Sequence, residues 1–164
     1  MIQIQKVNNT LEFETIEKLA FEILHEVYDP IIPSAHTEYF LKKFQSASVI
    51  KNQIKNEDFR YFLLNFNKLH VGYLGIQKNK EKLILSKLYI RKSFRGKKIG
   101  KVALEFVQQY TIENRFKKIE LIVNQQNQDT INIYQKFGFK ITESMVNSFP
   151  NGHFVRDYKM EKIV

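Results

Sequence analysis

Hydrophobic and polar residues recur along the first half of the chain with the periods of both strands and helices. Alternation at Ile2 and Ile4 is typical of a half-buried strand, and a stripe through Ile16, Leu19 and Ile23 is typical of an amphipathic helix. The predicted elements, in chain order, are a strand within 1–7, helices at 14–28, 37–45 and 47–55, and strands at 59–65, 69–76 and 83–90. The prolines Pro30 and Pro33 end the first helix.

The second half of the chain continues the same mixture of elements. An apolar stripe predicts a helix that starts near Ile99, and a strand is predicted at 119–123. A short helix ends near Gly138, a strand continues to about Thr142, and a last strand covers 153–162. Because strands and helices alternate, the order predicts an α/β fold with a mixed sheet, and no linker divides residues 1–164 into more than one domain.

A basic turn with glycines joins the strand at 83–90 to the helix that follows. It runs from Arg91 to Gly100 and carries the cations Arg95, Lys97 and Lys98. The first N–H groups of a helix have no partners and its dipole favours an anion, while glycine allows a ligand close to the backbone. This arrangement predicts a phosphate site, although a solvated basic turn would look the same. The turn has neither the GxGxxG nor the Walker pattern.

The segment after the strand at 119–123 predicts a second functional helix. Asn127 is expected to cap it by accepting a free N–H group, and Gly138 stands where a helix stop is expected. Asn127 and Tyr134 are about two helical turns apart, so they share nearly one face. Both residues are therefore candidates for one site.

Together the two segments resemble the GNAT superfamily of acyl-CoA-dependent N-acetyltransferases. The run from Arg95 to Gly100 resembles its pyrophosphate pattern, Arg/Gln-x-x-Gly-x-Gly/Ala. The run from Asn127 to Phe139 resembles its Asn-x-x-Ala-x-x-Phe-Tyr-x-x-x-Gly-Phe signature. Lys98 stands where the family usually has its middle glycine, Thr130 where it has alanine, and Ile133 where it has an aromatic residue.

The resemblance implies a central sheet that splays between its fourth and fifth strands and admits the pantetheine arm of acetyl-CoA, the co-substrate. Tyr134 is then the acid that protonates the departing sulfur. The implied coenzyme-binding residues are Leu88, Tyr89 and Ile90 on the fourth strand, Arg95, Gly96, Lys97, Lys98, Ile99, Gly100 and Lys101 in the turn and helix start, and Asn127. Tyr134 and Asn127 could also have purely structural roles, as a core aromatic residue and a helix cap.

The general base is not indicated by any motif. Relatives often use a glutamate on the fourth strand, where this chain has Ser86 and Lys87. The titratable candidates by type are the four histidines, His25, His36, His70 and His153. The acids Glu26, Asp29 and Glu38 are expected near an acceptor site, because the early helices of the family usually line it. No short histidine spacing suggests a metal site.

Composition narrows the class of protein further. Absence of cysteine excludes disulfides and a cysteine nucleophile, and no signal peptide or membrane span is visible, which predicts a cytoplasmic protein without membrane partner. The net charge of +9 is spread along the chain instead of forming an arm, so nucleic acid is not the expected partner. Whether the chain forms a homodimer is left open.

The expected function is acetyl transfer from acetyl-CoA to a primary amine of a small molecule or peptide. The run at 151–162 resembles the ending of a bacterial subgroup similar to polyamine acetyltransferases. A polycation would be repelled by the chain's charge unless Glu26, Asp29, Glu38 or Asp157 forms an acidic pocket. The alternative is a non-catalytic acyl-CoA-binding or nucleic-acid-associated module on the same fold.

Overall fold

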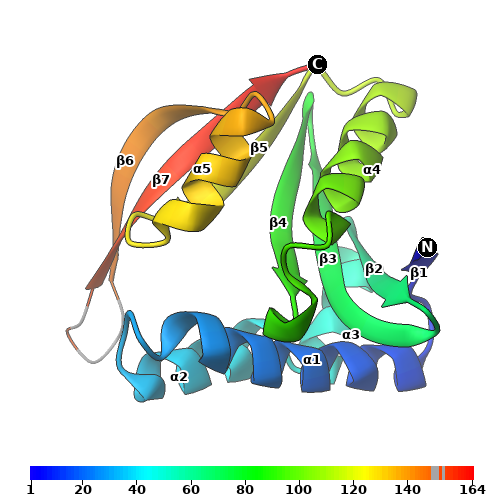
Figure 1. Ribbon diagram of the computed structural model, residues 1–164, viewed down its shortest axis with the longest axis vertical. Helices are drawn as coiled ribbons and strands as arrows, with labels where there is room; N and C mark the ends of the chain where they lie inside the picture. Colours follow the sequence, from blue (N-terminus) through cyan, green and yellow to red (C-terminus); the bar gives the residue numbers. More distant parts are fainter. Residues whose placement is uncertain (149–151, 153) are drawn as a thin grey trace.

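The computed structural model describes residues 1–148, 152 and 154–164 and contains one seven-stranded sheet of order β1-β2-β3-β4-β5-β7-β6 (Figure 1). The strands are β1 (Ile2–Lys6), β2 (Phe59–Phe66), β3 (Leu69–Asn79), β4 (Lys82–Ile90), β5 (Lys118–Asn124), β6 (Lys140–Ser148) and β7 (Phe154–Ile163). The helices are α1 (Thr10–Tyr28), α2 (Ser34–Phe44), α3 (Ala47–Asn56), α4 (Ile99–Glu113) and α5 (Gln128–Lys136), with a short 3₁₀ turn at Lys92–Phe94.

The predicted α/β fold with a mixed sheet is confirmed, and the bounds of α1 and β6 differ most from the prediction. α1 begins at Thr10 because the Asn9 side chain accepts the N–H of Glu12, while the Glu12 carboxylate accepts the N–H of Asn8. β6 extends to Ser148 because it pairs with β7 along its length. The predicted connection at 149–151 and residue 153 lie outside the described residues.

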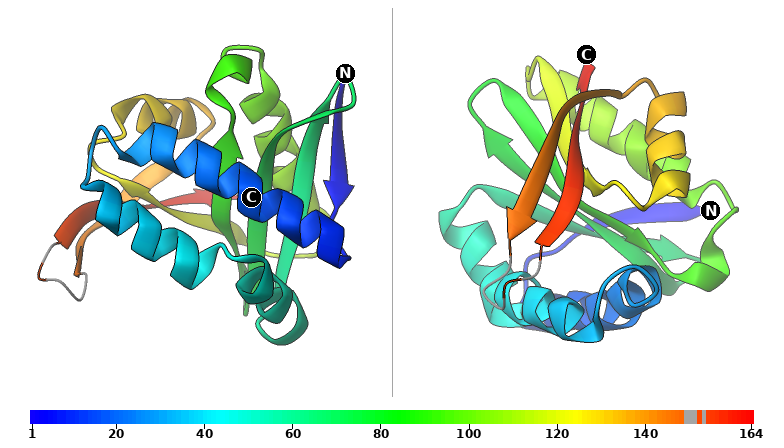
Figure 2. Two further views of the ribbon diagram at one scale, coloured as in Figure 1. Left: turned by 90° about the horizontal axis from the view of Figure 1, so that it is seen from below. Right: turned by 90° about the vertical axis from the view of Figure 1, so that its left-hand side faces the viewer.

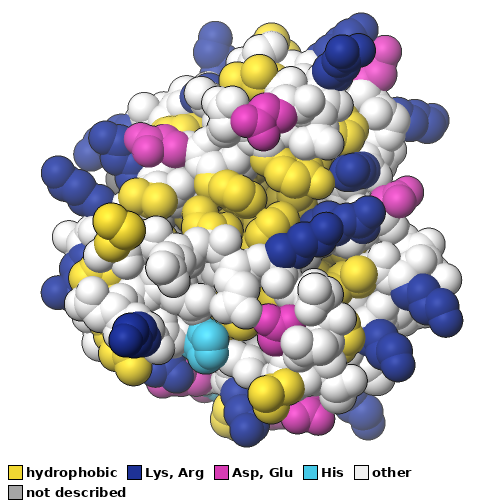
Figure 3. Space-filling view, turned by 90° about the vertical axis from the view of Figure 1, so that its right-hand side faces the viewer, with side chains coloured by type: hydrophobic (Ala, Val, Ile, Leu, Met, Phe, Trp, Pro, Cys, Tyr) yellow, Lys and Arg dark blue, Asp and Glu magenta, His cyan; other side chains and the backbone are white. Residues whose placement is uncertain are grey.

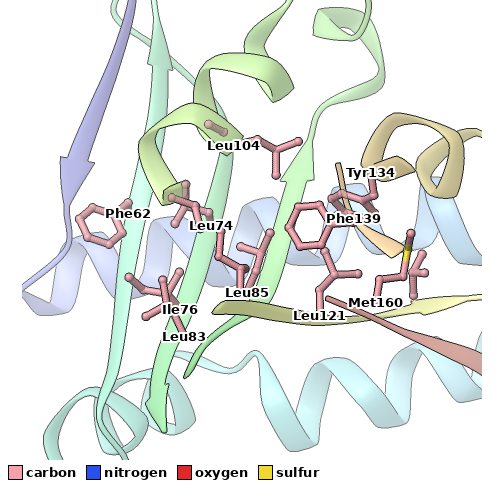
Figure 4. Close-up of a cluster of buried hydrophobic side chains, with 14 of the residues drawn as sticks. Phe62, Leu74, Ile76, Leu83, Leu85, Leu104, Leu121, Tyr134, Phe139 and Met160 are labelled. Carbon is pink, nitrogen blue, oxygen red and sulfur yellow. The ribbon is translucent and has the colours of Figure 1, made fainter. Parts of the chain in front are cut away.

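Helices cover both faces of the sheet and create two hydrophobic cores. α1, α2 and α3 lie together on one side of β2–β4, and α4 lies on the other (Figure 2). The core under α1 includes Ile16, Ile23 and Tyr61. The core under α4 and α5 includes Leu85, Leu121 and Tyr134 (Figure 4). The middle of the sheet therefore has a separate hydrophobic core on each of its two faces.

The sheet splits between β4 and β5, as expected. These strands are parallel, and their pairing covers only Lys82–Ile84 against Lys118–Glu120. Beyond Ile84 the two strands diverge toward α1 (Figure 1). Within the described strands, β4–β5 is the parallel pair and every other neighbouring pair is antiparallel. The second half of β4 thus presents an edge to the gap.

A bulge at Ser86 controls which side chains of β4 face which layer. Gly75 on β3 pairs with Lys87, while Ile76 pairs with Leu85, so Ser86 has no partner in the ladder. Leu85 and Leu88 consequently both face the core under α4. Lys87 is left on the side of α2, where it contacts Phe40.

On the face in Figure 3, basic side chains are scattered, apart from a short run beside the centre. Lysine and arginine lie mostly around its margin, and hydrophobic side chains gather near its centre. No helix within the described residues is both long and apolar enough to cross a membrane.

Candidate active site

A cavity of about 350 Å³ lies in the gap between β4 and β5, beside the starts of α4 and α5. We call it the α4 cavity. Seven of the predicted catalytic and coenzyme-binding residues line it, namely Leu88, Tyr89, Ile90, Arg95, Gly100, Asn127 and Tyr134. They come from β4, the basic turn, α4 and α5, so the fold brings the two sequence motifs together at one site.

The start of α4 is open to an anion. Its N-cap, Lys98, has φ +64° and makes no side-chain cap, so the first N–H groups of the helix are not satisfied by it. Lys98 adopts the left-handed conformation that favours glycine, which explains why the corresponding GNAT position is usually glycine. Gly96, with φ +77°, provides the other left-handed residue of the turn.

Arg95 is held at the border of the α4 cavity. Its Nε donates to the Ile90 carbonyl at 3.2 Å, and its guanidinium lies 4.0 Å from the Glu26 carboxylate. Glu26 also accepts the N–H of Lys92 at 3.3 Å. These contacts connect α1 to the basic turn and fix a cation beside the open helix end.

The remaining predicted coenzyme-binding residues of the turn and helix start do not line this cavity. They are Gly96, Lys97, Lys98, Ile99 and Lys101. Ile99 is only 1% exposed and packs in the core, while Lys101 lies 3.9 Å from Glu105.

The predicted side-chain cap at Asn127 is wrong. Asn127 occupies the N-cap position of α5, but its side chain accepts no helix N–H group. Its ψ of 64° departs from the extended conformation typical of a capping residue. The turn is instead folded by Asn124, whose Oδ1 accepts the N–H of Gln126 at 2.8 Å. The Asn127 side chain is thereby left to line the α4 cavity.

Tyr134 lies on α5 and is 8% exposed. Its ring contacts that of Phe139, with centroids 5.6 Å apart, and Figure 4 shows the two side by side. Burial raises the pKa of the Tyr134 phenol above its ordinary value of 10.0, and the nearby Tyr28 raises it further. The hydroxyl is therefore protonated at neutral pH, and Tyr134 lines the α4 cavity.

A second cavity, of about 500 Å³, lies between α2 and the diverging strands. We call it the α2 cavity. Five phenylalanine and tyrosine side chains line it, namely Tyr28, Tyr39, Phe40, Phe44 and Tyr89. Both cavities are lined by Tyr28, Leu85, Ser86, Tyr89 and Ile122. The bulge on β4 therefore lies where the two cavities meet.

Tyr28 stands at this junction and was not singled out from the sequence. Its hydroxyl lies 3.3 Å from that of Tyr89, and burial raises the pKa of both phenols. Helical spacing placed Tyr28 at the end of α1 without indicating which strands α1 crosses. Only the fold shows that the helix ends over the split in the sheet.

A lysine of β4 and an aspartate of β7 line the α2 cavity from opposite sides of the split. Lys87 on β4 has its Nζ 3.1 Å from the Ser86 hydroxyl and 5.2 Å from the centre of the Phe40 ring, and burial lowers its pKa to about 8. Asp157 on β7 is 9% exposed and accepts the Asn147 amide at 2.5 Å. Burial raises the pKa of Asp157, although the Asn147 hydrogen bond opposes this effect.

The other candidate bases lie mainly elsewhere. His25 bonds Asp29 at 2.9 Å and Glu38 at 2.6 Å, and neither the histidine nor these two acids lines either cavity. Burial opposes protonation of His25, but the hydrogen bonds to both carboxylates outweigh it and raise its pKa. Asp29 and Glu38 therefore pair with His25, and neither lines a cavity as a residue of the expected acceptor site would.

The remaining histidines and Glu26 are dispersed. His70 is exposed and bonds Asn65 at 2.6 Å, outside both cavities, while His36 is buried and lines the α2 cavity. His153 lies outside the described residues. Glu26 lines the α4 cavity, beside Arg95.

Comparison with known proteins agrees with this geometry. Residues 22–162 match the model of the acetyltransferase (GNAT) domain. The chain is 24% identical to spermidine N(1)-acetyltransferase of Thermoplasma acidophilum, over 90% of this chain and 94% of that protein.

Solved structures show the same fold. The PaiA N-acetyltransferase of T. acidophilum in complex with coenzyme A superposes with a TM-score of 0.83 at 22% identity, covering 100% of this chain and 99% of that one. The ribosomal-protein-S18-alanine N-acetyltransferase of Escherichia coli gives 0.76 at 15% identity, covering 100% and 94%. With a matching family model over most of its length, a splayed sheet and an open helix end beside the split, this chain belongs to the GNAT family of acetyltransferases, which use acetyl-CoA as acyl donor.

Proposed function

We propose that the chain transfers the acetyl group of acetyl-CoA to a primary amine of a small molecule or peptide, by direct attack of the amine. The observation that carries this proposal is that the two cavities meet at Ser86, one beside a helix start without a side-chain cap and the other of a size suited to a small acceptor. One cavity would hold the donor and the other the acceptor.

The residues of the α4 cavity fit the coenzyme. The first N–H groups of α4 would bind its diphosphate, with Arg95 at the border. The edge of β4 beyond Ile84, which has no β5 partner, offers backbone groups to the pantetheine amides. Gly100 and Asn127 complete the wall. Acetyl-CoA supplies a thioester, and the chemistry left to the protein is proton transfer and orientation.

Tyr134 is the proposed general acid. Its phenol stays protonated at neutral pH because burial raises its pKa, and it faces the α4 cavity, where the departing sulfur would need a proton. An N–H of β4 near Leu88–Ile90 would polarise the carbonyl oxygen during attack, since that part of the edge borders the α4 cavity and is unpaired with β5.

Asp157 is the proposed acceptor of the proton that the attacking ammonium must lose. It is the carboxylate that lines the α2 cavity among the described residues, and it is buried. A lysine-like ammonium has an ordinary pKa of about 10.4, so it needs a partner that removes the proton. Asp157 can also hold the amine by charge before the attack.

The testing experiment measures coenzyme A release from acetyl-CoA with a panel of acceptors. The panel contains spermidine, aminoglycosides, amino acids and short peptides, because the relatives include enzymes named for spermidine and for a protein alanine. Acceptor-dependent release supports the proposal and identifies the substrate class. Acetyl-CoA binding without release for any acceptor would favour a non-catalytic acyl-CoA-binding module, and absence of binding would overturn the proposal.

A further inference from the structure

The Lys87 ammonium is a partly buried cation with no counter-ion among the described residues. Its described contacts are the Ser86 hydroxyl and the face of the Phe40 ring. Among the ion pairs of the described residues, none includes Lys87. Buried charges in proteins are normally paired, because removal from water is costly unless an opposite charge compensates it. An anion on a ligand in the α2 cavity would provide that compensation.

The walls of the same cavity favour a flat apolar group. Tyr28 and Tyr89 stand at the junction, and Phe40 and Phe44 line the α2 side with their rings 5.1 Å apart. Aromatic side chains bind other rings through both contact area and edge-to-face geometry. The volume of about 500 Å³ accommodates a molecule of the size of an aromatic amino acid.

The charges of the cavity lie on different walls. Lys87 belongs to β4 and Asp157 to β7, which stand on opposite sides of the split, while Lys43 adds a second cation from α2. A polyamine would have to place several positive charges against two lysines and one carboxylate. An acceptor with one ammonium and one carboxylate instead matches both signs.

We propose that the acceptor is a small aromatic amine that carries a carboxylate, such as an aromatic amino acid, with the carboxylate bound by the Lys87 ammonium and the amine directed toward the junction at Ser86. This inference rests on the proposed function and names the substrate class of its acceptor cavity. Lys87 is then a specificity-determining residue that contacts the substrate away from the reacting atoms.

The test compares matched acceptors in matched variants. L-Phenylalanine and L-tryptophan are each compared with their amides, in which the carboxylate becomes neutral at almost unchanged shape. The proteins are wild type, Lys87→Met, Lys87→Arg and Lys42→Met, the last removing an exposed lysine of α2 that lines neither cavity. The ratio of kcat/KM for acid to that for amide is compared between proteins, so that the different amine pKa values cancel.

Lys87→Met is expected to lower the acid-to-amide ratio about 10- to 100-fold, the usual effect of losing a charge-assisted hydrogen bond. Lys87→Arg keeps most of the ratio, since it keeps the positive charge, and Lys42→Met leaves it unchanged. Spermidine turnover, if present, does not fall in Lys87→Met, because the removed charge repels a polycation.

Two results would overturn the inference. One is an equal loss of turnover for acid and amide in both Lys87 variants, which is the behaviour of a general base. The other is an unchanged ratio in Lys87→Met with no loss of turnover for either acceptor. Calorimetric titration of L-phenylalanine and its amide, in the presence of coenzyme A, provides a readout without turnover. If no acceptor releases coenzyme A, the proposed function fails, while a Lys87-dependent preference for the acid in binding still supports this inference and its absence ends it.

Discussion

The two cavities of this protein are built in different ways. The α4 cavity takes most of its wall from one stretch, from β4 to α5, and offers backbone groups at a bulged strand edge and an open helix end. The α2 cavity takes its wall from side chains of α1, α2, β4, β5, β6 and β7. A coenzyme shared by a family can be bound by backbone geometry, which requires particular glycines and turns. An acceptor is selected by side chains, which can change without changing the fold.

Tyr134→Phe is expected to have the largest effect among the changes that test the donor and acceptor cavities separately. We expect kcat to fall by about 10² or more, the usual contribution of a general acid, while the Kd for acetyl-CoA stays unchanged. The ring and its contact with Phe139 are preserved, so the loss comes from the hydroxyl alone. Coenzyme A release and calorimetric titration of acetyl-CoA measure the two quantities. Tyr110→Phe on α4, outside both cavities, is the control. Wild-type turnover in Tyr134→Phe would remove the acid role.

Asp157→Asn tests the acceptor side separately. The amide keeps the shape and can still accept the Asn147 hydrogen bond, but it cannot take a proton. We expect kcat/KM for the acceptor to fall about 10²-fold with little change in acetyl-CoA affinity. The raised pKa of Asp157 also predicts that activity rises with pH as its carboxyl ionises. This rise in the pH–activity profile should be absent from Asp157→Asn. Glu113→Gln, an exposed change on α4, controls for lost charge. Equal effects on both substrates' affinities would mean that Asp157 supports the fold instead.

Gly100→Leu should affect the donor side alone. A methyl group at Gly100 would meet only the Ile90 side chain at an ordinary 3.5 Å, so the helix can accept a side chain, while the rest of leucine would enter the α4 cavity. We expect the Kd for acetyl-CoA to rise about tenfold, consistent with a penalty of about 1–3 kcal/mol for overpacking. Val102→Leu, on the same helix but outside both cavities, is the matched control. Unaltered affinity would place the coenzyme elsewhere.

The effect of Lys87→Met on the free energy of unfolding should be smaller than these effects on activity and binding. Burial lowers the pKa of Lys87 from 10.5 to about 8 in the folded protein. Below about pH 8 the folded state therefore holds a disfavoured charge, and this cost is relieved as pH rises from 8 to 10.5. We expect the variant to gain about 1–2 kcal/mol at pH 7, less than the full shift implies at 1.36 kcal/mol per unit, because the side chain is partly exposed.

Urea unfolding at pH 7 and pH 9.5 measures that gain. The difference between Lys87→Met and wild type should shrink at the higher pH, since wild-type Lys87 is then largely neutral in the folded state. A variant less stable than wild type at pH 7 would show that the lysine stabilises the fold. A more stable but less selective variant would identify Lys87 as retained for function at a cost in stability.

The sequence predicted the order of the elements and the split in the sheet, while the roles of the cavity residues stay predictions and several local features were missed for physical reasons. Periodicity predicted the start of α4 and both ends of β5 to within about one residue. The resemblance to GNAT proteins identified Gly100 and Tyr134 as candidate site residues. The start of α1 was placed too late because Asn9 lies outside the apolar stripe and acts through a cap. Asn127 has a residue type suited to capping, but its backbone angles prevent it. Lys87 was not singled out because its position depends on the bulge at Ser86, which has no clear sequence pattern.

The short ladder between β4 and β5 also has a consequence for cooperativity. Only three register pairs connect the β1–β4 part of the sheet to the β5–β7 part, so few backbone hydrogen bonds resist separation of the two. A molecule that lies in the gap and contacts both strands stabilises the association of the two parts of the sheet, because its binding energy is lost when they separate. Amide hydrogen exchange along the unpaired edge of β4 and across β5 would therefore slow when acetyl-CoA is added, more than exchange in the β2–β3 hairpin, where the ladder is already continuous.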